Sequence, residues 1–240
     1  MVDYREGQIL LVDKELKWTS FDVVNKLRYA LKRRYDVKKF KVGHAGTIDP
    51  LASGLLLICT GKKTKEIESM MGLEKEYTGS IQLGGTTASY DLETEVIPTN
   101  KLVTPTKNEL ETAMHSFLGE QEQTPPIYSA KRHKGRKSYL LAREGKVFQP
   151  KSALVNILEF ELLDFQDGRV DFRLKCSKGT YVRSLAHDLG QKLTCGAYLS
   201  ALRRTKIGDF SVDDSKSVQA WVEQIEKSSG ATQNNIDLNS

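Results

Sequence analysis

The chain has 240 residues, of which 39% are hydrophobic, so it is long enough to bury the core of one large domain or two small ones. Its 36 Lys and Arg residues against 31 Asp and Glu give a net charge of +5, which suits an anionic partner without requiring one. No apolar run is long enough to span a bilayer, and the N-terminus lacks the layout of a signal peptide. These features exclude a membrane-spanning helical protein and favour a cytoplasmic one.

The three cysteines of the chain are Cys59, Cys176 and Cys195. They form no C-x-x-C pair, and the first two stand in apolar patterns. We therefore expect buried free thiols in a reducing compartment rather than a disulfide framework.

A strand and a helix are predicted first along the chain. The apolar run Gln8–Val12 predicts a short strand, and Thr19 and Ser20 can cap the helix that follows. Four apolar residues recur at helical spacing in this helix, namely Phe21, Val24, Leu27 and Leu31. Its exposed face is basic, with Lys26, Arg28, Lys32 and Arg33, and we interpret most of these charges as a solvated helix face.

The stretch Val42–Thr60, VGHAGTIDPLASGLLLICT, is the most distinctive of the chain. Its first half is predicted to be a turning loop without helix or strand, because it contains Gly43, Gly46, Pro50 and Gly54. The run Leu55–Cys59 predicts a buried strand. Asp49 before Pro50 is usual turn chemistry on its own, but it shares this loop with His44 and Thr47, and loops on rigid scaffolds commonly carry function.

Further elements follow as far as residue 118. Lys62–Met71 predicts a helix that ends at Gly72, and Glu76–Leu83 alternates as a strand with Tyr77 on its inward face. From the pattern alone, Tyr77 is as well explained as a core aromatic as by a functional role. A polar loop at Gly84–Asp91 and a short strand at Glu93–Ile97 are predicted next, and Thr106 with Glu109 forms a capping box for a helix reaching Leu118.

The C-terminal half begins with a strand pair. Val155–Phe165 and Arg169–Ser177 flank a turn at Asp167-Gly168, and the second strand alternates apolar and polar residues. Helices are predicted at Thr180–Leu193 and Val218–Ile225, and the polar segment Ser228–Ser240 is predicted to be disordered. Strands and helices without regular β-α-β alternation indicate an α+β fold.

Positive charge is concentrated in the segment Thr124–Gly145, TPPIYSAKRHKGRKSYLLAREG, which has prolines near its start and a glycine at its end. The seven residues from Lys131 to Lys137 contain no acid, which favours a protruding loop that contacts phosphates over a merely solvated one.

These motifs together resemble one family. The loop GHAGTIDPLASGLLLICTGKKTK closely resembles the signature of the TruB family, the tRNA pseudouridine-55 synthases, and the similarity continues in EKEYTGSIQLG, in the basic loop, in CSKGTYVRSLAHDLG and in GAYLSALRRTKIGDFSVDDS. The family's usual D-K-P-x-G segment reads Asp13-Lys14-Glu15-Leu16-Lys17 in this chain, without its Pro and Gly.

The resemblance implies a role for each matching residue. Asp49 would be the catalytic nucleophile, Tyr77 the active-site aromatic that stacks on an extruded base, and Arg183 the cation that pairs with Asp49. From the pattern alone Arg183 is a freely solvated arginine in the first turn of a helix, where a cation is unfavourable by about 0.3–1 kcal/mol. Substrate or RNA contacts are implied for His44, Lys14, Leu202, Tyr181, Lys131, Arg132, Lys134, Arg136 and Lys137. Without the resemblance, His44 is a structural turn residue and Leu202 an ordinary core residue.

The resemblance also implies a fold and a domain layout. We expect a mixed, largely antiparallel sheet flanked by helices and RNA-binding loops. A catalytic domain is predicted over residues 1–215, with an RNA-binding thumb at about 124–148, followed by a short helix and tail over 216–240. The family's usual C-terminal PUA domain has no room in this layout.

The chemistry of the family needs neither metal nor redox cofactor, because uridine is isomerised without oxidation or hydrolysis. The four histidines have no partners at metal-ligand spacing, so we predict no metal and no cofactor. The expected partner is the T arm of tRNA, bound by a monomer without an obligate protein partner. Two alternatives remain: a pseudouridine synthase for another RNA, and a non-catalytic protein that binds or folds tRNA.

Overall fold

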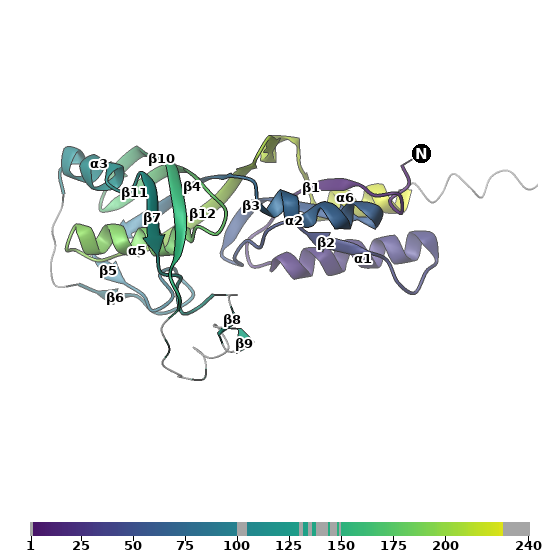
Figure 1. Cartoon of the computed structure of the whole chain (residues 1–240), viewed down its shortest axis with the longest axis horizontal. Helices are drawn as coiled ribbons and strands as arrows, with labels where there is room; N and C mark the ends of the chain where they lie inside the picture. The colour runs from purple at the N-terminus through teal and green to yellow at the C-terminus, as the bar shows by residue number, and fades with distance from the viewer. Residues whose placement is uncertain are drawn as a thin grey trace, which may run out of the picture. The chain divides into compact units, whose positions relative to one another are not determined.

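The computed structural model describes residues 2–99, 105–129, 132–133, 136–137, 144, 148 and 150–227. The chain divides into two compact units, which are described separately. The first comprises Met1–Leu73 with Arg203–Ser240, and the second is the continuous segment Glu74–Leu202 (Figure 1). The predicted layout, with a catalytic domain over residues 1–215 and a short helix and tail over 216–240, stays a prediction.

The strands of the first unit are β1 (Ile9–Lys14), β2 (Val42–His44), β3 (Ala52–Thr60), the end of β12 (Ala197–Ile207), β13 (Phe210–Ser211) and β14 (Lys216–Ser217). They are arranged in the order β14-β1-β3-β12, with β2 paired to β3 and β13 to β12. β1 is antiparallel to β3 and parallel to β14.

The predicted strand at residues 55–59 is confirmed, because all five residues lie within β3 and are fully buried. The prediction that all the glycines before it exclude regular structure is wrong for two of them. Gly43 lies in β2 and Gly54 in β3, so only the segment between these strands is a loop. Gly54 has φ +102°, and its missing side chain lets the backbone of Arg204 approach.

The helices of the first unit are α1 (Ser20–Tyr35), α2 (Ile67–Met71) and α6 (Val218–Lys227), with 3₁₀ turns at Gly61–Glu66 and Val212–Asp214. Thr19 caps α1 in a capping box with Asp22, as the sequence predicted for this helix start. Phe21 was expected on the buried stripe and is instead 59% exposed, because the buried face runs through Val23 and Val24. The helix predicted from Lys62 begins as a 3₁₀ turn and ends at Gly72 as expected.

Helix α6 belongs to the body of the first unit. It lies beside α1 (Figure 1), and the Trp221 indole N–H donates to the carbonyl oxygen of Leu11 in β1 at 2.8 Å. The C-terminal helix predicted at 218–225 is confirmed, and it covers the edge of the sheet formed by β1 and β14.

The strands of the second unit are β4 (Lys75–Leu83), β5 (Gly85–Thr86), β6 (Ile97–Pro98), β7 (Gly119–Gln123), β8 (Arg132–His133), β9 (Arg136–Lys137), β10 (Ala153–Gln166), β11 (Arg169–Cys176) and the start of β12. The main sheet has the order β12-β4-β11-β10-β7, and the pairs from β4 to β7 are antiparallel. The predicted turn between β10 and β11 is present, with positive φ at both Asp167 and Gly168.

The short strand predicted at Glu93–Ile97 is wrong except for its last residue, which pairs in β6. Side chains bind the backbone of this segment instead. The Thr94 amide donates to Ser89 Oγ at 3.2 Å, and the Glu93 amide donates to Asp91 Oδ1 at 3.0 Å. Short polar side chains that hydrogen-bond nearby backbone compete with strand pairing.

Two helices pack on the sheet of the second unit, α3 (Lys107–His115) and α5 (Val182–Lys192). The predicted capping box of α3 is present, but the helix ends three residues before Leu118, which is exposed. Leu110 of α3 and Leu185 of α5 join the core with Phe172 of β11. The predicted α+β class with a largely antiparallel sheet is confirmed.

All three cysteines are buried and none forms a disulfide, as predicted. Within the described part of the chain, no helix is long and apolar enough to cross a membrane. The predicted disordered tail at 228–240 lies outside the described residues.

Candidate functional site

The loop between β2 and β3 carries Asp49, which is half-buried. The Ala52 amide at the start of β3 donates to the carbonyl oxygen of Asp49 at 3.1 Å. The Ser20 hydroxyl of α1 accepts from the Ile48 amide at 3.0 Å and donates to its carbonyl at 3.2 Å. The loop is therefore fixed to a strand and to a helix N-terminus on either side of Asp49, so the backbone that carries this carboxylate is held in place.

Lys14 lies at the end of β1 and is fully buried. Its ammonium donates to three backbone carbonyl oxygens, those of Glu15 at 2.9 Å, Trp18 at 2.9 Å and Ala52 at 2.5 Å. Burial lowers the pKa of Lys14 to about 8; the charge of Arg204 acts in the same direction, whereas the Asp49 carboxylate opposes it. The ammonium thus lies within electrostatic reach of Asp49, and it is occupied by carbonyls of its own unit.

His44 is the last residue of β2 and is half-buried, with no hydrogen-bond partner for Nδ1 within the described residues. Burial lowers its pKa, and the neighbouring Arg204 charge lowers it further. The imidazole is therefore neutral at pH 7.

Arg183 is 4% exposed near the start of α5, so the alternative of a freely solvated arginine is wrong. Its Nη1 donates to the Ser89 carbonyl at 3.1 Å and its Nη2 to the Tyr128 carbonyl at 3.0 Å. Nε lies 3.5 Å from Asp91 Oδ2 in an ion pair whose two side chains are almost fully buried. In the sequence, Asp91 is only the last residue of a predicted polar loop, and no spacing connects it to a residue 92 positions later.

The other predicted residues of the second unit gather around its core. Tyr77 is 8% exposed on the inward face of β4, as predicted, and Leu202 packs partly buried against the same core. The backbone of Tyr181, just before α5, donates to Gln123 Oε1 at 2.8 Å and accepts from its Nε2 at 3.2 Å. The predicted Asp49–Arg183 pair joins residues of different units and stays a prediction, as do the functional roles of these side chains.

A further cluster of the second unit was not predicted. The rings of Tyr90 and His187 stack with centroids 3.9 Å apart and an angle of 13°. Burial lowers the pKa of His187 and raises the pKa of Asp188, the next residue of α5, to about 6. Tyr90 lies between Ser89 and Asp91, both of which bind Arg183, and it has a positive φ of 65°. The stacking therefore fixes the segment that surrounds Arg183.

The basic loop is only partly described. Lys131 and Lys134 lie outside the described residues, as do the side chains of Arg132, Arg136 and Lys137. The backbones of β8 and β9 form a two-stranded ladder in which Arg132 pairs with Lys137 and His133 with Arg136. Their predicted RNA contacts stay predictions.

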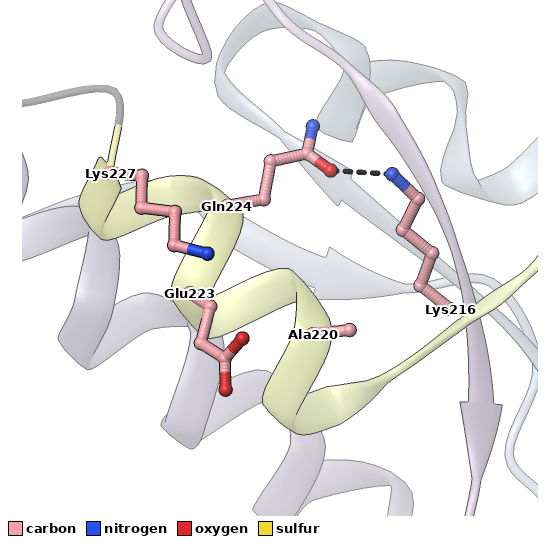
Figure 2. A pocket seen from close by; sticks show the side chains of 5 residues that line it. All are labelled: Lys216, Ala220, Glu223, Gln224 and Lys227. Atoms are coloured by element: carbon pink, nitrogen blue, oxygen red, sulfur yellow. Dashed lines mark hydrogen bonds between the residues drawn. The ribbon is translucent and has the colours of Figure 1, made fainter.

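A depression of about 630 Å³ in the first unit is separate from the predicted site (Figure 2). It is lined by Lys216, Ala220, Glu223, Gln224 and Lys227. Figure 2 shows the Lys216 ammonium directed at the Gln224 side chain, to which it donates at 2.6 Å. In the residues that the structure describes, no group of three or more His, Cys, Asp or Glu side chains could hold a metal ion.

Family models match nearly the whole chain. Residues 32–182 match the TruB family pseudouridylate synthase N-terminal domain, and residues 183–235 match the tRNA pseudouridylate synthase B C-terminal domain. The chain belongs to the TruB family.

A relative from Flavobacterium johnsoniae named tRNA pseudouridine synthase B is 49% identical over 229 residues, which cover 93% of this chain and 98% of the relative. A protein of the same name from Chloroherpeton thalassium is 49% identical over 232 residues, 96% of this chain and 95% of its own. The prediction of an isomerase of this enzyme class is confirmed.

Solved structures agree on the fold. A chain in the crystal structure of a Cbf5-Nop10-Gar1 complex superposes with a TM-score of 0.69 at 26% identity, covering 91% of this chain and 54% of that one. A chain of an H/ACA RNP bound to a substrate RNA containing 2'-deoxyuridine gives a TM-score of 0.67 at 24% identity, covering 94% and 56%. This chain thus spans about half the length of each, and the second likeness shows the fold alone.

Proposed function

We propose that the chain converts uridine 55 in the T loop of tRNA to pseudouridine, with Asp49 as the nucleophile. The observation that carries the proposal is the match to proteins named tRNA pseudouridine synthase B at 49% identity over nearly the full length of both chains. The location of Asp49 on a loop fixed at both sides supports its role.

The reaction is an isomerisation. The bond from C1′ to N1 of the base breaks, the base turns, and a bond forms from C1′ to C5. C5 then loses its hydrogen as a proton and N1 gains one, so the atoms balance without an oxidant or reductant. A carboxylate is a known nucleophile for chemistry at a sugar carbon.

Each predicted residue has a place in this scheme. Asp49 acts as the nucleophile, Arg183 keeps its carboxylate charged, and Tyr77 stacks on the extruded base. His44 fills the space that the base leaves in the RNA, since a neutral imidazole can stack there without carrying charge into the site. Extruding a base from a loop costs only a few kcal/mol when it is already unpaired.

The basic loop that contains Lys131, Arg132, Lys134, Arg136 and Lys137 would hold the phosphates of the T arm. In this scheme the chain acts as a monomer in the cytoplasm without an obligate protein partner. Affinity for tRNA is then expected to fall steeply with added salt, and reversing the charge of this loop is expected to reduce that salt dependence.

Asp49→Asn tests the proposal. Because C5 gives up its hydrogen during the reaction, a tRNA transcript labelled with tritium at C5 of uridine releases tritium to water as pseudouridine forms. We expect the wild-type protein to release the label of one uridine, and Asp49→Asn to lower the rate more than about a thousandfold with unchanged tRNA affinity.

Two controls make this test decisive. Asp209→Asn changes an exposed aspartate of the same unit and should leave the rate unchanged. A transcript with cytidine at position 55 should release no tritium. Release from that transcript would contradict the T-loop assignment, and full activity of Asp49→Asn would contradict the role of Asp49.

A further inference from the structure

Arg204 is one of the most deeply buried large side chains of the protein, with 1% of its surface exposed. It lies in the part of β12 that belongs to the first unit. Its guanidinium donates to three backbone carbonyl oxygens, those of Leu55 at 2.7 Å from Nε, Thr47 at 3.3 Å from Nη1 and Gly46 at 3.2 Å from Nη2. All three acceptors belong to the loop of Asp49 or to the start of the strand that follows it.

Burying the charged guanidinium of Arg204 costs free energy, because the group loses its hydration. Within the described residues, no carboxylate lies within ion-pair distance of Arg204, so only carbonyl dipoles offset the loss of its hydration. Buried charges are normally paired with an opposite charge, and a well-packed apolar side chain is often at least as stabilising. Stability of the fold alone is therefore a poor reason for an arginine here.

The three acceptors bracket Asp49. Gly46 and Thr47 precede it by three and two residues, and Leu55 follows it by six. Lys14 holds the intervening segment through the carbonyl of Ala52, whose amide in turn donates to the Asp49 carbonyl. The two buried cations thus bind the loop before Asp49 and after it.

The backbone around Arg204 is shaped for this contact. Gly54 pairs with Lys14 across β1 and β3, and a Cβ on Gly54 would overlap the carbonyl oxygen of Arg204. Gly46 has φ +101°, which turns its carbonyl in a way that side-chain-bearing residues rarely adopt. The neighbouring Arg203 differs in every respect, since its side chain is 40% exposed and pairs with Asp13 at 2.8 Å.

We infer that Arg204 is a positioning residue for the reaction, whose planar guanidinium holds the Asp49 loop in its reactive geometry through the carbonyls of Gly46, Thr47 and Leu55. The inference rests on the proposed function, because it assigns Arg204 to the placement of the proposed nucleophile. A displacement of about 1 Å in a catalytic group can cost a hundredfold in rate. Lysine is a poor replacement here, because its three donors radiate from one nitrogen, whereas Arg204 reaches its three acceptors from three different nitrogens spread over a rigid plane.

Arg204→Lys and Arg204→Gln test this inference, with Arg203→Lys as the matched control. The first keeps the charge without the fork, and the second removes the buried charge and keeps one donor group. We expect both to lower kcat for a tRNA transcript about 10- to 100-fold with KM changed less than threefold. Arg203→Lys should change neither constant more than threefold.

Hydrogen exchange gives a second readout that does not depend on activity. In both Arg204 variants, the amides of Ala45, Ile48 and Ala52 should exchange at least tenfold faster, whereas amides of β10 and β11 should keep their protection. Arg203→Lys should leave the three loop amides protected.

Three results would overturn the inference. Folded Arg204 variants with wild-type kcat would show that the loop needs no guanidinium, and a rise in KM alone would assign Arg204 to RNA binding. If neither variant folds, Arg204 stabilises the whole unit and has no specific positioning role. A wild-type protein that forms no pseudouridine would instead refute the proposed function, and the exchange experiment would still show whether Arg204 holds the loop.

Discussion

Among the described residues, each unit buries one arginine, and the two guanidinium groups have different hydrogen-bond partners. Arg204 of the first unit is bound by three carbonyl oxygens, whereas Arg183 of the second has two carbonyls and the Asp91 carboxylate. Carbonyl dipoles fix the position of a guanidinium but leave its full charge, while a carboxylate neutralises most of it. A buried arginine that keeps only dipoles is suited to holding backbone in place, and one that shares its charge is coupled to the ionisation of its partner.

The largest effect is expected from removing the carboxylate from this pair. Asp91→Asn removes the carboxylate that lies 3.5 Å from Nε of the buried Arg183 guanidinium. Breaking a buried ion pair costs about 3–5 kcal/mol, so the melting temperature should fall by about 10 °C. Glu6→Gln, which breaks the exposed pair with Lys62, should have almost no effect in the same thermal melt. Equal melting temperatures for the two variants would show that the Asp91 carboxylate does not stabilise the fold.

The second largest effect is expected from deprotonation of Lys14, whose ammonium, like the Arg204 guanidinium, is bound by backbone carbonyl oxygens. Its pKa is about 8 in the folded protein against 10.5 as the ordinary value, and above pH 8 the side chain loses its charge and one donor. We expect the rate of pseudouridine formation to fall with a midpoint near pH 8. Lys14→Arg, which does not titrate in this range, should show no such fall. A wild-type rate that is flat from pH 7 to 9.5 contradicts this role.

The stability of the protein should respond in the opposite direction to the same titration. Below pH 8, Lys14 is protonated in both the folded and unfolded chains, so it adds no pH dependence. Between pH 8 and about 10.5 the unfolded chain binds a proton that the folded chain has lost, so the contribution of Lys14 to stability rises with pH. Denaturant titrations of the wild type and Lys14→Arg at pH 7.5 and 9.5 isolate this contribution.

A smaller effect on the rate is expected from removing the aromatic stack of Tyr90 and His187, which holds the segment that binds Arg183. His187→Ala removes the ring that stacks on Tyr90, while His187→Phe retains an aromatic face. Since such pairs contribute about 0.5–1.5 kcal/mol, His187→Ala should lower kcat about 2- to 10-fold and His187→Phe should restore it. If both variants match the wild type, the stack does not contribute to the site.

The smallest effect is expected at Asp188. Its pKa is raised to about 6 from 3.8, so between these pH values the unfolded chain releases a proton that the folded chain keeps, and stability falls as pH rises. Asp188→Asn removes this cost and should raise the melting temperature by about 2–4 °C at pH 8 and by less at pH 5. An equal gain at both pH values would assign the change to packing.

The sequence predicted those helices, strands and turns that depend only on residues close to one another along the chain. The apolar run of β3, the helix cap at Thr19, the capping box at Thr106 and the turn at Asp167-Gly168 were all predicted, because each depends on residues close in the sequence. Phe21 and the strand predicted from Glu93 were misread because the choice there depends on packing and on side chains that compete for the backbone.

The residues of the candidate site likewise include some that the sequence predicted and some that it did not. The motif around Asp49 was recognisable, but the burial of Lys14 and Arg204 was not, since both residue types are almost always exposed and their acceptors are backbone atoms without a sequence signature. Asp91 was missed as the partner of Arg183 because a contact across 92 residues leaves no periodic trace in one sequence.

The division of the chain into two units also affects the order in which they can fold during translation. The second unit is continuous and can fold as soon as it leaves the ribosome, whereas the first is completed only by the segment that begins at Arg203. Leu55 is translated 149 residues before the arginine that binds its carbonyl, an interval of about 10–30 s at ordinary translation rates. Throughout that interval the loop that carries Asp49 lacks the hydrogen bonds that Arg204 donates to Gly46, Thr47 and Leu55, so premature termination before β12 would leave a product without this support.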